Sequence, residues 1–304
     1  LCTIGGVIAG NFFYNLALNP SADQTVVMKA PHKTIELDDI KQEVWDDNAA
    51  WFDNSGRTEA AIQSYDGLDL CAWVVRQPRA TSRWVLMAHG YGGNGRQLMG
   101  MGRKFSAMGY NLLMPDARGC GRSDGDYIGM GWHDRLDMLE WIDQIIAWDP
   151  GAEIVLYGIS MGGGTVMMVS GEELPGNVKA IVEDCGYTSA WEEFSYQLKG
   201  VFGMPEFPMM HFADVVTRIR AGYSLQEANA LEQVKKATVP MLFIHGTEDT
   251  FVPYSMLDIV YEAAGSAEKE KLAIEGAGHA AAGSVAPELY WQTIEDFISR
   301  YVTA

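Results

Sequence analysis

The sequence predicts an α/β fold in which a mostly parallel sheet carries helices on both faces. Two observations lead to this prediction. Short apolar runs with the length of buried strands recur along the chain, and they alternate with stretches of helical spacing. Several of these runs end in turns that carry Gly, Asp, Ser or His, the composition expected where strand ends form a site. With 304 residues, the chain is long enough for one α/β domain with an insertion.

The individual elements can be assigned in chain order. A linker follows residue 18 and leads to a helix over about 38–52. A hairpin comes next, with strands over 59–65 and 70–76 that are separated by Asp66-Gly67. The later strands are continuous apolar runs, as expected when a parallel sheet is buried on both faces; they cover 83–88, 111–114, 154–157, 178–182, 239–244 and 271–274. Helices are predicted over 97–108, 133–148 and 285–301.

One interval is too long to be a simple connection between neighbouring elements. It covers residues 187–238, and we expect two or three helices there that form a cap over the site. The cap interrupts a core made of residues 59–186 and 239–304, and residues 1–58 precede the core as a hydrophobic leader, linker and helix. The cap is rich in Phe and Met, which favours an apolar pocket wall, although such residues are also ordinary core. Together with Gly90, the predicted substrate-binding residues are Phe202, Met204, Phe207 and Met210.

Residues 1–18 are almost wholly uncharged. The chain begins at Leu rather than Met, so we expect that an upstream segment has been removed. One interpretation is the end of a signal anchor, which predicts possible membrane contact and favours a membrane-associated or exported protein over a cytoplasmic one. The alternative is a helix that packs on the domain or on a neighbouring subunit. Asn11 and Asn15 weaken the membrane-spanning interpretation.

Composition excludes some classes of function. The formal net charge is −18, so the chain lacks the basic patch that nucleic-acid binding requires. The four cysteines, Cys2, Cys71, Cys120 and Cys185, are scattered and form no Cys-x-x-Cys pair. We therefore predict no nucleic-acid partner, no metal and no disulfide framework, and the oligomeric state stays open.

The strongest chemical signal lies between Glu153 and Thr165. A short apolar run indicates a buried strand, which passes through Gly158-x-Ser160-x-Gly162 into a helix. This is the strand–turn–helix context of a nucleophile elbow, where the turn strains the central residue and its neighbours must lack side chains. Ser160 would then stand at a helix N-terminus, whose dipole favours negative charge. The alternative is a helix N-cap serine in a glycine-rich turn.

A serine hydroxyl needs a base to act as a nucleophile at neutral pH. His279 lies in a glycine-flanked loop after the last predicted strand, and we expect it to be that base. A carboxylate must hold the imidazole in the right tautomer. Asp249, just after the strand at 239–244, is the preferred candidate, and Glu248 and Asp184 are the alternatives. His89, His133 and His245 are expected to be structural hydrogen-bonding residues.

The tetrahedral intermediate of acyl transfer needs two backbone N–H donors. We expect one from Met161, directly after the nucleophile, and the other from Tyr91. Tyr91 lies in the loop after the strand at 83–88, where Gly90, Gly92 and Gly93 let the backbone turn inward.

The ordered set of motifs resembles the α/β-hydrolase superfamily over about residues 60–302. The motifs are His89-Gly-x-Gly-Gly93, Asp116-x-Arg118-Gly119-x-Gly121-x-Ser123, Gly158-x-Ser160-x-Gly162 and the loops of Asp249 and His279. The residues of these motifs are most similar to those of bacterial serine hydrolases with a hydrophobic N-terminal leader. These hydrolases are relatives of cinnamoyl and feruloyl esterases and of peptidase-type hydrolases. The resemblance implies an eight-stranded sheet, a Ser-His-Asp triad and no cofactor.

These patterns together predict a serine hydrolase that cleaves small-molecule carboxylic esters through an acyl-enzyme on Ser160, with aromatic or short to medium acyl groups. A peptidase or amidase, or a thioesterase or acyltransferase, would use the same triad. A membrane-tethered binding protein with an inactive site is the alternative from another class, because a fold alone does not secure a function.

Overall fold

The computed structural model describes residues 2–22 and 42–303. Its centre is one eight-stranded sheet in the order β1-β2-β4-β3-β5-β6-β7-β8. The strands are β1 (Thr58–Gln63), β2 (Asp69–Val75), β3 (Arg83–Ala88), β4 (Asn111–Pro115), β5 (Glu153–Ile159), β6 (Val178–Asp184), β7 (Met241–Gly246) and β8 (Lys269–Ile274).

Strand direction follows the apolar pattern of the sequence. Only the β1–β2 and β2–β4 pairs are antiparallel, and the other five pairs are parallel. The strands β3, β4, β5 and β7 are buried at nearly every position, as parallel strands covered on both faces must be. The prediction of a mostly parallel α/β sheet is therefore confirmed.

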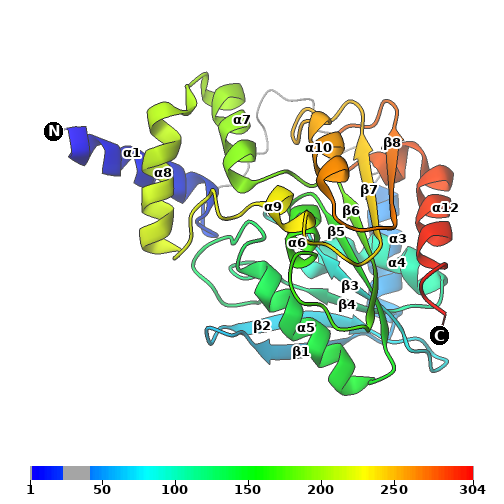
Figure 1. The fold of residues 1–304 in the computed structure, drawn as a ribbon. Helices are drawn as coiled ribbons and strands as arrows, with labels where there is room; N and C mark the ends of the chain where they lie inside the picture. Colours follow the sequence, from blue (N-terminus) through cyan, green and yellow to red (C-terminus); the bar gives the residue numbers. More distant parts are fainter. Residues whose placement is uncertain (1, 23–41, 304) are drawn as a thin grey trace.

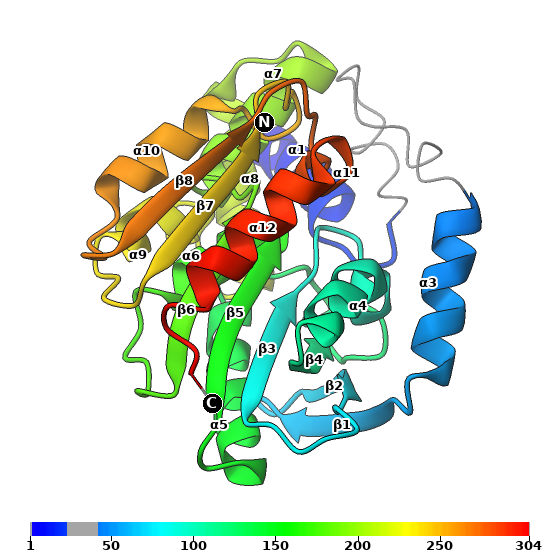
Figure 2. The ribbon, with the colours of Figure 1, turned by 90° about the vertical axis from the view of Figure 1, so that its right-hand side faces the viewer.

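Helices cover both faces of the sheet (Figures 1 and 2). On one face the buried core includes residues of α3, α4 and α12, and on the other it includes residues of α5, α6, α9 and α10. The helices are α1 (Cys2–Ala17), α3 (Gln42–Asn54), α4 (Met99–Ala107), α5 (Asp134–Trp148), α6 (Met161–Val169), α7 (Ala190–Phe202), α8 (Glu206–Arg220), α9 (Ala230–Val234), α10 (Ser255–Ala263), α11 (Ala282–Val285) and α12 (Pro287–Ile298). A 3₁₀ turn, Gly95–Leu98, precedes α4.

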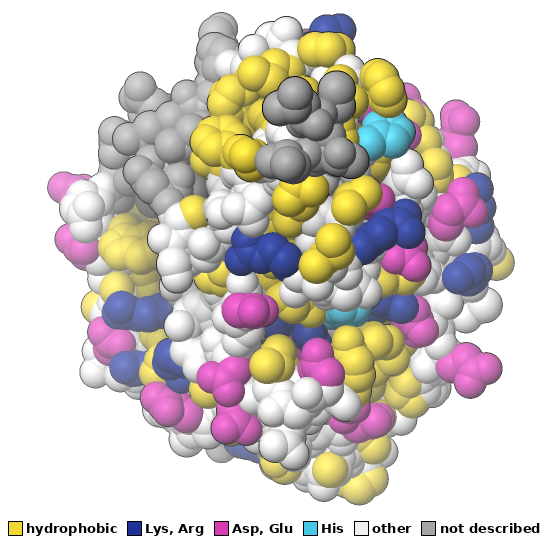
Figure 3. All heavy atoms as spheres, turned by 90° about the vertical axis from the view of Figure 1, so that its left-hand side faces the viewer, with side chains coloured by type: hydrophobic (Ala, Val, Ile, Leu, Met, Phe, Trp, Pro, Cys, Tyr) yellow, Lys and Arg dark blue, Asp and Glu magenta, His cyan; other side chains and the backbone are white. Residues whose placement is uncertain are grey.

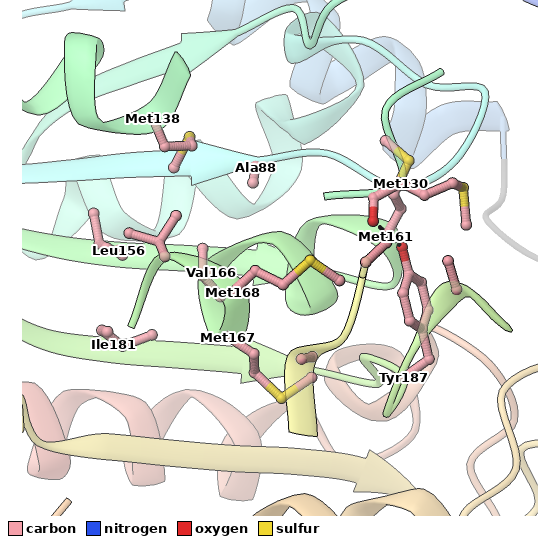
Figure 4. Packing of buried hydrophobic residues seen from close by; sticks show 14 of the residues in the cluster. Ala88, Met130, Met138, Leu156, Met161, Val166, Met167, Met168, Ile181 and Tyr187 are labelled. Carbon is pink, nitrogen blue, oxygen red and sulfur yellow. Dashed lines mark hydrogen bonds between the residues drawn. The ribbon is translucent and has the colours of Figure 1, made fainter. Parts of the chain in front are cut away.

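Helix α6 follows the elbow and is buried along its whole length. It packs between the sheet and the neighbouring helices, with Val166, Met167 and Met168 among its core contacts (Figure 4). At its N-terminus Met161 lies near Met130 and Tyr187, and the Tyr187 hydroxyl donates to the Met130 carbonyl at 3.1 Å. The helix that presents the elbow serine is therefore held rigidly by packing on every side.

The interval predicted as a cap contains α7, α8 and α9. Helices α7 and α8 stand away from the sheet, whereas α9 packs on α6 of the core (Figure 1). The boundaries of the cap at 187 and 238 stay a prediction.

Residues 5–18 pack against the cap, which is the alternative that the sequence left open for this segment. Helix α1 lies on α8 (Figure 1). A Cβ added to Gly6 would lie 2.3 Å from the Phe212 ring, and one added to Gly10 would lie 2.3 Å from the Phe212 carbonyl oxygen. The small residues therefore allow the two helices to approach closely. Among the described residues, no helix combines the length and the apolar character needed to cross a membrane.

The predicted elements differ from the structure mainly at their ends. The helix expected over 38–52 runs from Gln42 to Asn54, and positions 38–41, like most of the linker, lie outside the described residues. The helix expected over 285–301 is interrupted before Pro287, because proline favours the first turn of a new helix. Helix α10 was not predicted.

Candidate active site

The elbow between β5 and α6 places Ser160 in a strained backbone conformation. Its φ is 57° and its ψ is −119°, outside the regions that most L-residues adopt. The two flanking glycines are required by close backbone contacts. A Cβ on Gly158 would lie 2.0 Å from the Gly162 carbonyl oxygen, and one on Gly162 would lie 2.0 Å from the Ala88 carbonyl oxygen. The strained serine and the two sterically required glycines therefore have the geometry of a nucleophile elbow.

Ser160 lies within hydrogen-bonding distance of His279. The Ser160 Oγ to His279 Nε2 distance is 2.8 Å, and the His279 Nδ1 to Asp249 Oδ2 distance is also 2.8 Å. A carboxylate can only accept, so Nδ1 donates to Asp249, which leaves Nε2 of the neutral ring to accept the serine proton. The Phe251 ring packs on the imidazole with the centroids 4.8 Å apart. The structure thus brings together the three side chains that the sequence selected.

Asp249 is held as an anion by several groups at once. Its Oδ1 accepts from the backbone N–H groups of Phe251 and Val252, each at 2.9 Å. Burial opposes ionisation of this carboxyl, but the charges and hydrogen bonds of His279 and His245 outweigh burial and lower its pKa to about 2. The orienting carboxylate is therefore ionised over the whole working range of pH.

His245 is a second histidine on the same carboxylate, a feature that sequence reasoning missed. Its Nε2 lies 3.0 Å from Asp249 Oδ2 and 3.0 Å from the Val252 carbonyl oxygen. Both are acceptors, so Nε2 carries a proton. Burial opposes a charge on this ring, but the hydrogen bond and charge of Asp249 outweigh it, and the pKa of His245 is raised. The i, i+4 spacing of His245 and Asp249 was the available signal.

The other candidate acids lie elsewhere. Glu248 is exposed to solvent. Asp184 is buried, its carboxylate accepts from the Tyr290 hydroxyl at 2.7 Å, and its carbonyl oxygen accepts from the Ser160 N–H at 2.8 Å. Burial raises the pKa of Asp184 to about 6. Asp184 therefore supports the elbow rather than the histidine.

The loop after β3 approaches the serine closely. A Cβ on Gly90 would lie 3.5 Å from the Cβ of Ser160. His89 fixes the base of the loop, since its Nε2 accepts from the Ala117 N–H at 3.0 Å and its Nδ1 donates to the Gly90 carbonyl at 2.8 Å. This pattern requires a neutral ring, and burial lowers the pKa of His89 accordingly. The predicted structural role of His89 agrees with these contacts.

A small cavity lies over the serine. Its lining includes Ser160, Tyr91 and Met161, so both predicted oxyanion residues border the space in which a substrate carbonyl would lie. Glu193 and Gln197 add polar groups to this lining. Within the described part of the chain, Glu193 Oε2 and Gln197 Oε1 are buried oxygens without a hydrogen-bond partner.

The four predicted cap residues separate into two pairs. Phe202 and Met210 line an apolar cavity next to the one over the serine. Met204 is 39% exposed and Phe207 is 72% exposed, and they belong to the lining of neither cavity. The structure therefore does not bring Met204 and Phe207 to the site, because they lie at and just after the turn between α7 and α8.

One group of potential metal ligands occurs among the described residues. Cys185, Asp249 and His279 have ligand atoms within 4.8 Å of one another. Asp249 and His279 already bond to each other, and burial raises the pKa of the Cys185 thiol well above its usual value. The Asp249–His279 hydrogen bond and the protonated Cys185 thiol make this group a poor cation site, and the absence of a metal stays a prediction.

Comparisons with known proteins agree with this fold. A family model described as alpha/beta hydrolase fold matches residues 83–208, and one described as Serine aminopeptidase, S33 matches residues 210–283. The uncharacterized protein YqkD of Bacillus subtilis is 24% identical over 250 residues, which are 82% of this chain and 81% of YqkD.

Solved structures show the same architecture. The Pyrococcus furiosus esterase Pf2001 superposes with a TM-score of 0.67 at 21% identity, covering 85% of this chain and 94% of the esterase. The Pyrococcus horikoshii acylaminoacyl peptidase superposes with a TM-score of 0.59 at 17% identity, covering 82% of this chain and 42% of the peptidase. The chain belongs to the α/β-hydrolase superfamily. Both family models describe hydrolases, which supports a hydrolase activity for this chain.

Proposed function

We propose that this protein hydrolyses carboxylic esters through an acyl-enzyme on Ser160. The observation that carries the proposal is the unbroken chain of short contacts from Ser160 through His279 to Asp249. The cavity over the serine gives an ester carbonyl access to the hydroxyl.

In the first half of the reaction, Ser160 Oγ attacks the ester carbonyl carbon while His279 Nε2 takes the hydroxyl proton. The carbonyl oxygen becomes an oxyanion, and the backbone N–H groups of Tyr91 and Met161 are the proposed donors to it. His279 then returns the proton to the leaving alcohol oxygen as the carbon–oxygen bond breaks. An acyl group stays on Ser160.

Water completes the cycle. It attacks the acyl carbon while His279 takes one of its protons. The tetrahedral intermediate then collapses to a carboxylic acid as the bond to Ser160 Oγ breaks and His279 returns the proton to that oxygen. Asp249 stays ionised throughout and stabilises the imidazolium.

The polar groups of the cavity favour an ester over a substrate with a free amino terminus. An aminopeptidase needs an anion for the ammonium group of its substrate. Among the described residues that line the cavity over the serine and the apolar cavity next to it, Glu193 is the one carboxyl group. Burial raises the pKa of Glu193 to about 8, so it is neutral near pH 7. An amide or thioester substrate with no ammonium group stays an alternative.

The test compares Ser160→Ala with Ser284→Ala, an exposed serine outside the site. With p-nitrophenyl butyrate we expect Ser160→Ala to lose about six orders of magnitude in kcat and Ser284→Ala to retain the wild-type rate. A fluorophosphonate probe should label the wild type and Ser284→Ala only. Retained turnover by Ser160→Ala would refute the proposal. Comparing kcat/KM for the ester with kcat/KM for a p-nitroanilide and a thioester of the same acyl group decides between the three substrate classes.

A further inference from the structure

A second, apolar cavity lies between the N-terminal helix and the cap. It holds about 580 Å³ of space that no atom occupies, part of it open to solvent. Helix α1 supplies one wall, and α7 and α8 supply the others; the main lining side chains are Phe13, Leu16, Ala17, Leu198, Phe202 and Met210. Tyr14, Gln197 and Thr217 are the lining residues with polar side-chain groups.

The apolar cavity adjoins the one over the serine. Phe194 and Gln197 line both cavities, so the two spaces share a wall at this point of α7. The cavity over the serine is lined by Ser160, Tyr91 and Met161, among others. The apolar space therefore adjoins the cavity over the serine at α7, and His279 lines neither of the two cavities.

Helix α1 is fixed in this position by specific contacts. Gly6 and Gly10 allow it to lie directly on Phe212 of α8. On its surface, the Arg220 guanidinium donates to the side-chain oxygens of Asn11 at 2.9 Å and Asn15 at 2.7 Å. Burial of Tyr14 and Leu18, at 2% and 1% exposure, completes the attachment. The wall that α1 supplies is therefore a built part of the cavity.

We propose that the N-terminal helix is one wall of an acyl pocket and that the enzyme prefers esters of medium-length saturated fatty acids. This inference rests on the proposed esterase activity. The leaving alcohol must lie toward His279, which protonates it, and the carbonyl oxygen must lie toward the N–H groups of Tyr91 and Met161, so the acyl chain takes a third direction. The apolar cavity, which adjoins the cavity over the serine at Phe194 and Gln197 and is not lined by His279, is the space that we assign to this chain. An apolar lining with few polar groups is matched by an alkyl chain, which needs no hydrogen bonds.

The inference predicts a chain-length dependence. Each methylene that enters the pocket should raise kcat/KM by about fourfold until the pocket is full. p-Nitrophenyl decanoate should therefore exceed p-nitrophenyl acetate in kcat/KM by at least about a hundredfold.

Adjacent phenylalanines on α1 provide a matched test. Phe13 lines the pocket, whereas Phe12 is 56% exposed. Phe13→Trp and Ala17→Phe fill the pocket, so we expect the decanoate-to-acetate ratio of kcat/KM to fall at least about tenfold. Phe12→Trp should leave the ratio unchanged. An equal decanoate-to-acetate ratio in Phe13→Trp and Phe12→Trp would overturn the inference. Phe13→Trp keeps the test valid if Ala17→Phe fails to fold.

Calorimetry with decanoate separates this inference from the proposed activity. Decanoate should bind to the Ser160→Ala protein, and adding Ala17→Phe should weaken that binding at least about tenfold, whether or not the wild type cleaves esters. Decanoate binding that Ala17→Phe leaves intact would overturn the pocket, even if Ser160-dependent ester hydrolysis is established. Loss of ester turnover in all proteins with intact decanoate binding would refute the activity and retain the pocket.

Discussion

The hydroxyl of Tyr91 donates a hydrogen bond to the carbonyl oxygen of Ala17 at 2.6 Å. This contact joins the loop that supplies the proposed oxyanion donor to the last turn of α1. Burial raises the pKa of the Tyr91 hydroxyl far above its usual value, so the hydroxyl is protonated and donates at every working pH. The N-terminal helix, which precedes the core in sequence, is thereby coupled to the proposed catalytic loop.

Removing this hydroxyl should loosen the oxyanion loop without removing its N–H donor. We expect Tyr91→Phe to lower kcat for p-nitrophenyl butyrate by about two- to tenfold, the range of one lost neutral hydrogen bond. KM should change less than kcat, because the loop acts mainly on the developing oxyanion. Tyr65→Phe, at a tyrosine that is 49% exposed, is the control and should have no effect. A kcat unchanged in Tyr91→Phe would show that the contact does not position the loop.

His245 should act as a positioning residue for Asp249. His245→Leu removes the donor at 3.0 Å and should lower kcat/KM about ten- to a hundredfold, because the carboxylate that orients His279 is then less restrained. His245→Gln retains an N–H donor and should recover much of the loss. Steady-state kinetics of both variants provide the test, with circular dichroism to verify folding. Equal losses in both variants would mean that shape, and not the hydrogen bond, is what matters.

The buried carboxyl of Glu193 predicts a pH dependence of stability. Its pKa is about 8, raised by burial from an ordinary value of 4.5, so between these limits the folded state binds a proton that the unfolded state has lost. The free energy of unfolding should therefore fall as pH rises through this window, by up to about 1.4 kcal/mol per pH unit from this group alone. Above pH 8 both states are ionised and the slope should disappear.

Glu193→Gln should remove this dependence. Between pH 5 and pH 8 we expect the variant to gain about 2–4 kcal/mol in unfolding free energy relative to the wild type, as measured by urea denaturation. Glu192→Gln changes the exposed neighbouring carboxylate and should leave the slope unaltered. If wild type and Glu193→Gln keep parallel pH profiles, the carboxyl is already ionised in the folded protein.

The predicted membrane contact can be tested at the outer face of α1. Val7, Ile8 and Phe12 are 56%, 66% and 56% exposed, and apolar side chains gather at this end of the molecule (Figure 3). With a net charge of −18, the protein should prefer zwitterionic vesicles to anionic ones. The replacement of Ile8 and Phe12 by Asp should abolish co-sedimentation with phosphatidylcholine vesicles. Leu289→Asp, on α12, is the control, and equal sedimentation of both proteins would exclude contact through α1.

Much of the site could be predicted because its signals are local. The Gly158-x-Ser160-x-Gly162 turn demands glycine on steric grounds, and apolar runs mark the strands that precede each site loop. The order of those loops along the chain then selected Asp249 and His279. Helix α10 was missed because it follows the Asp249 loop directly, without a separate start signal that we recognised.

The sequence by itself determined the α/β class, the strands and the three side chains of the proposed triad. The strands and the serine turn are local patterns, and the order of the loops along the chain selected Asp249 and His279. Only the tertiary structure decided which apolar side chains face the pocket: Phe202 and Met210 do, whereas Met204 and Phe207 face outward. It also placed His245 on Asp249 and α1 against the cap. The physical reason is that a side chain's direction depends on how whole helices pack against one another. That packing is set by contacts between residues far apart in the chain, which no local pattern records.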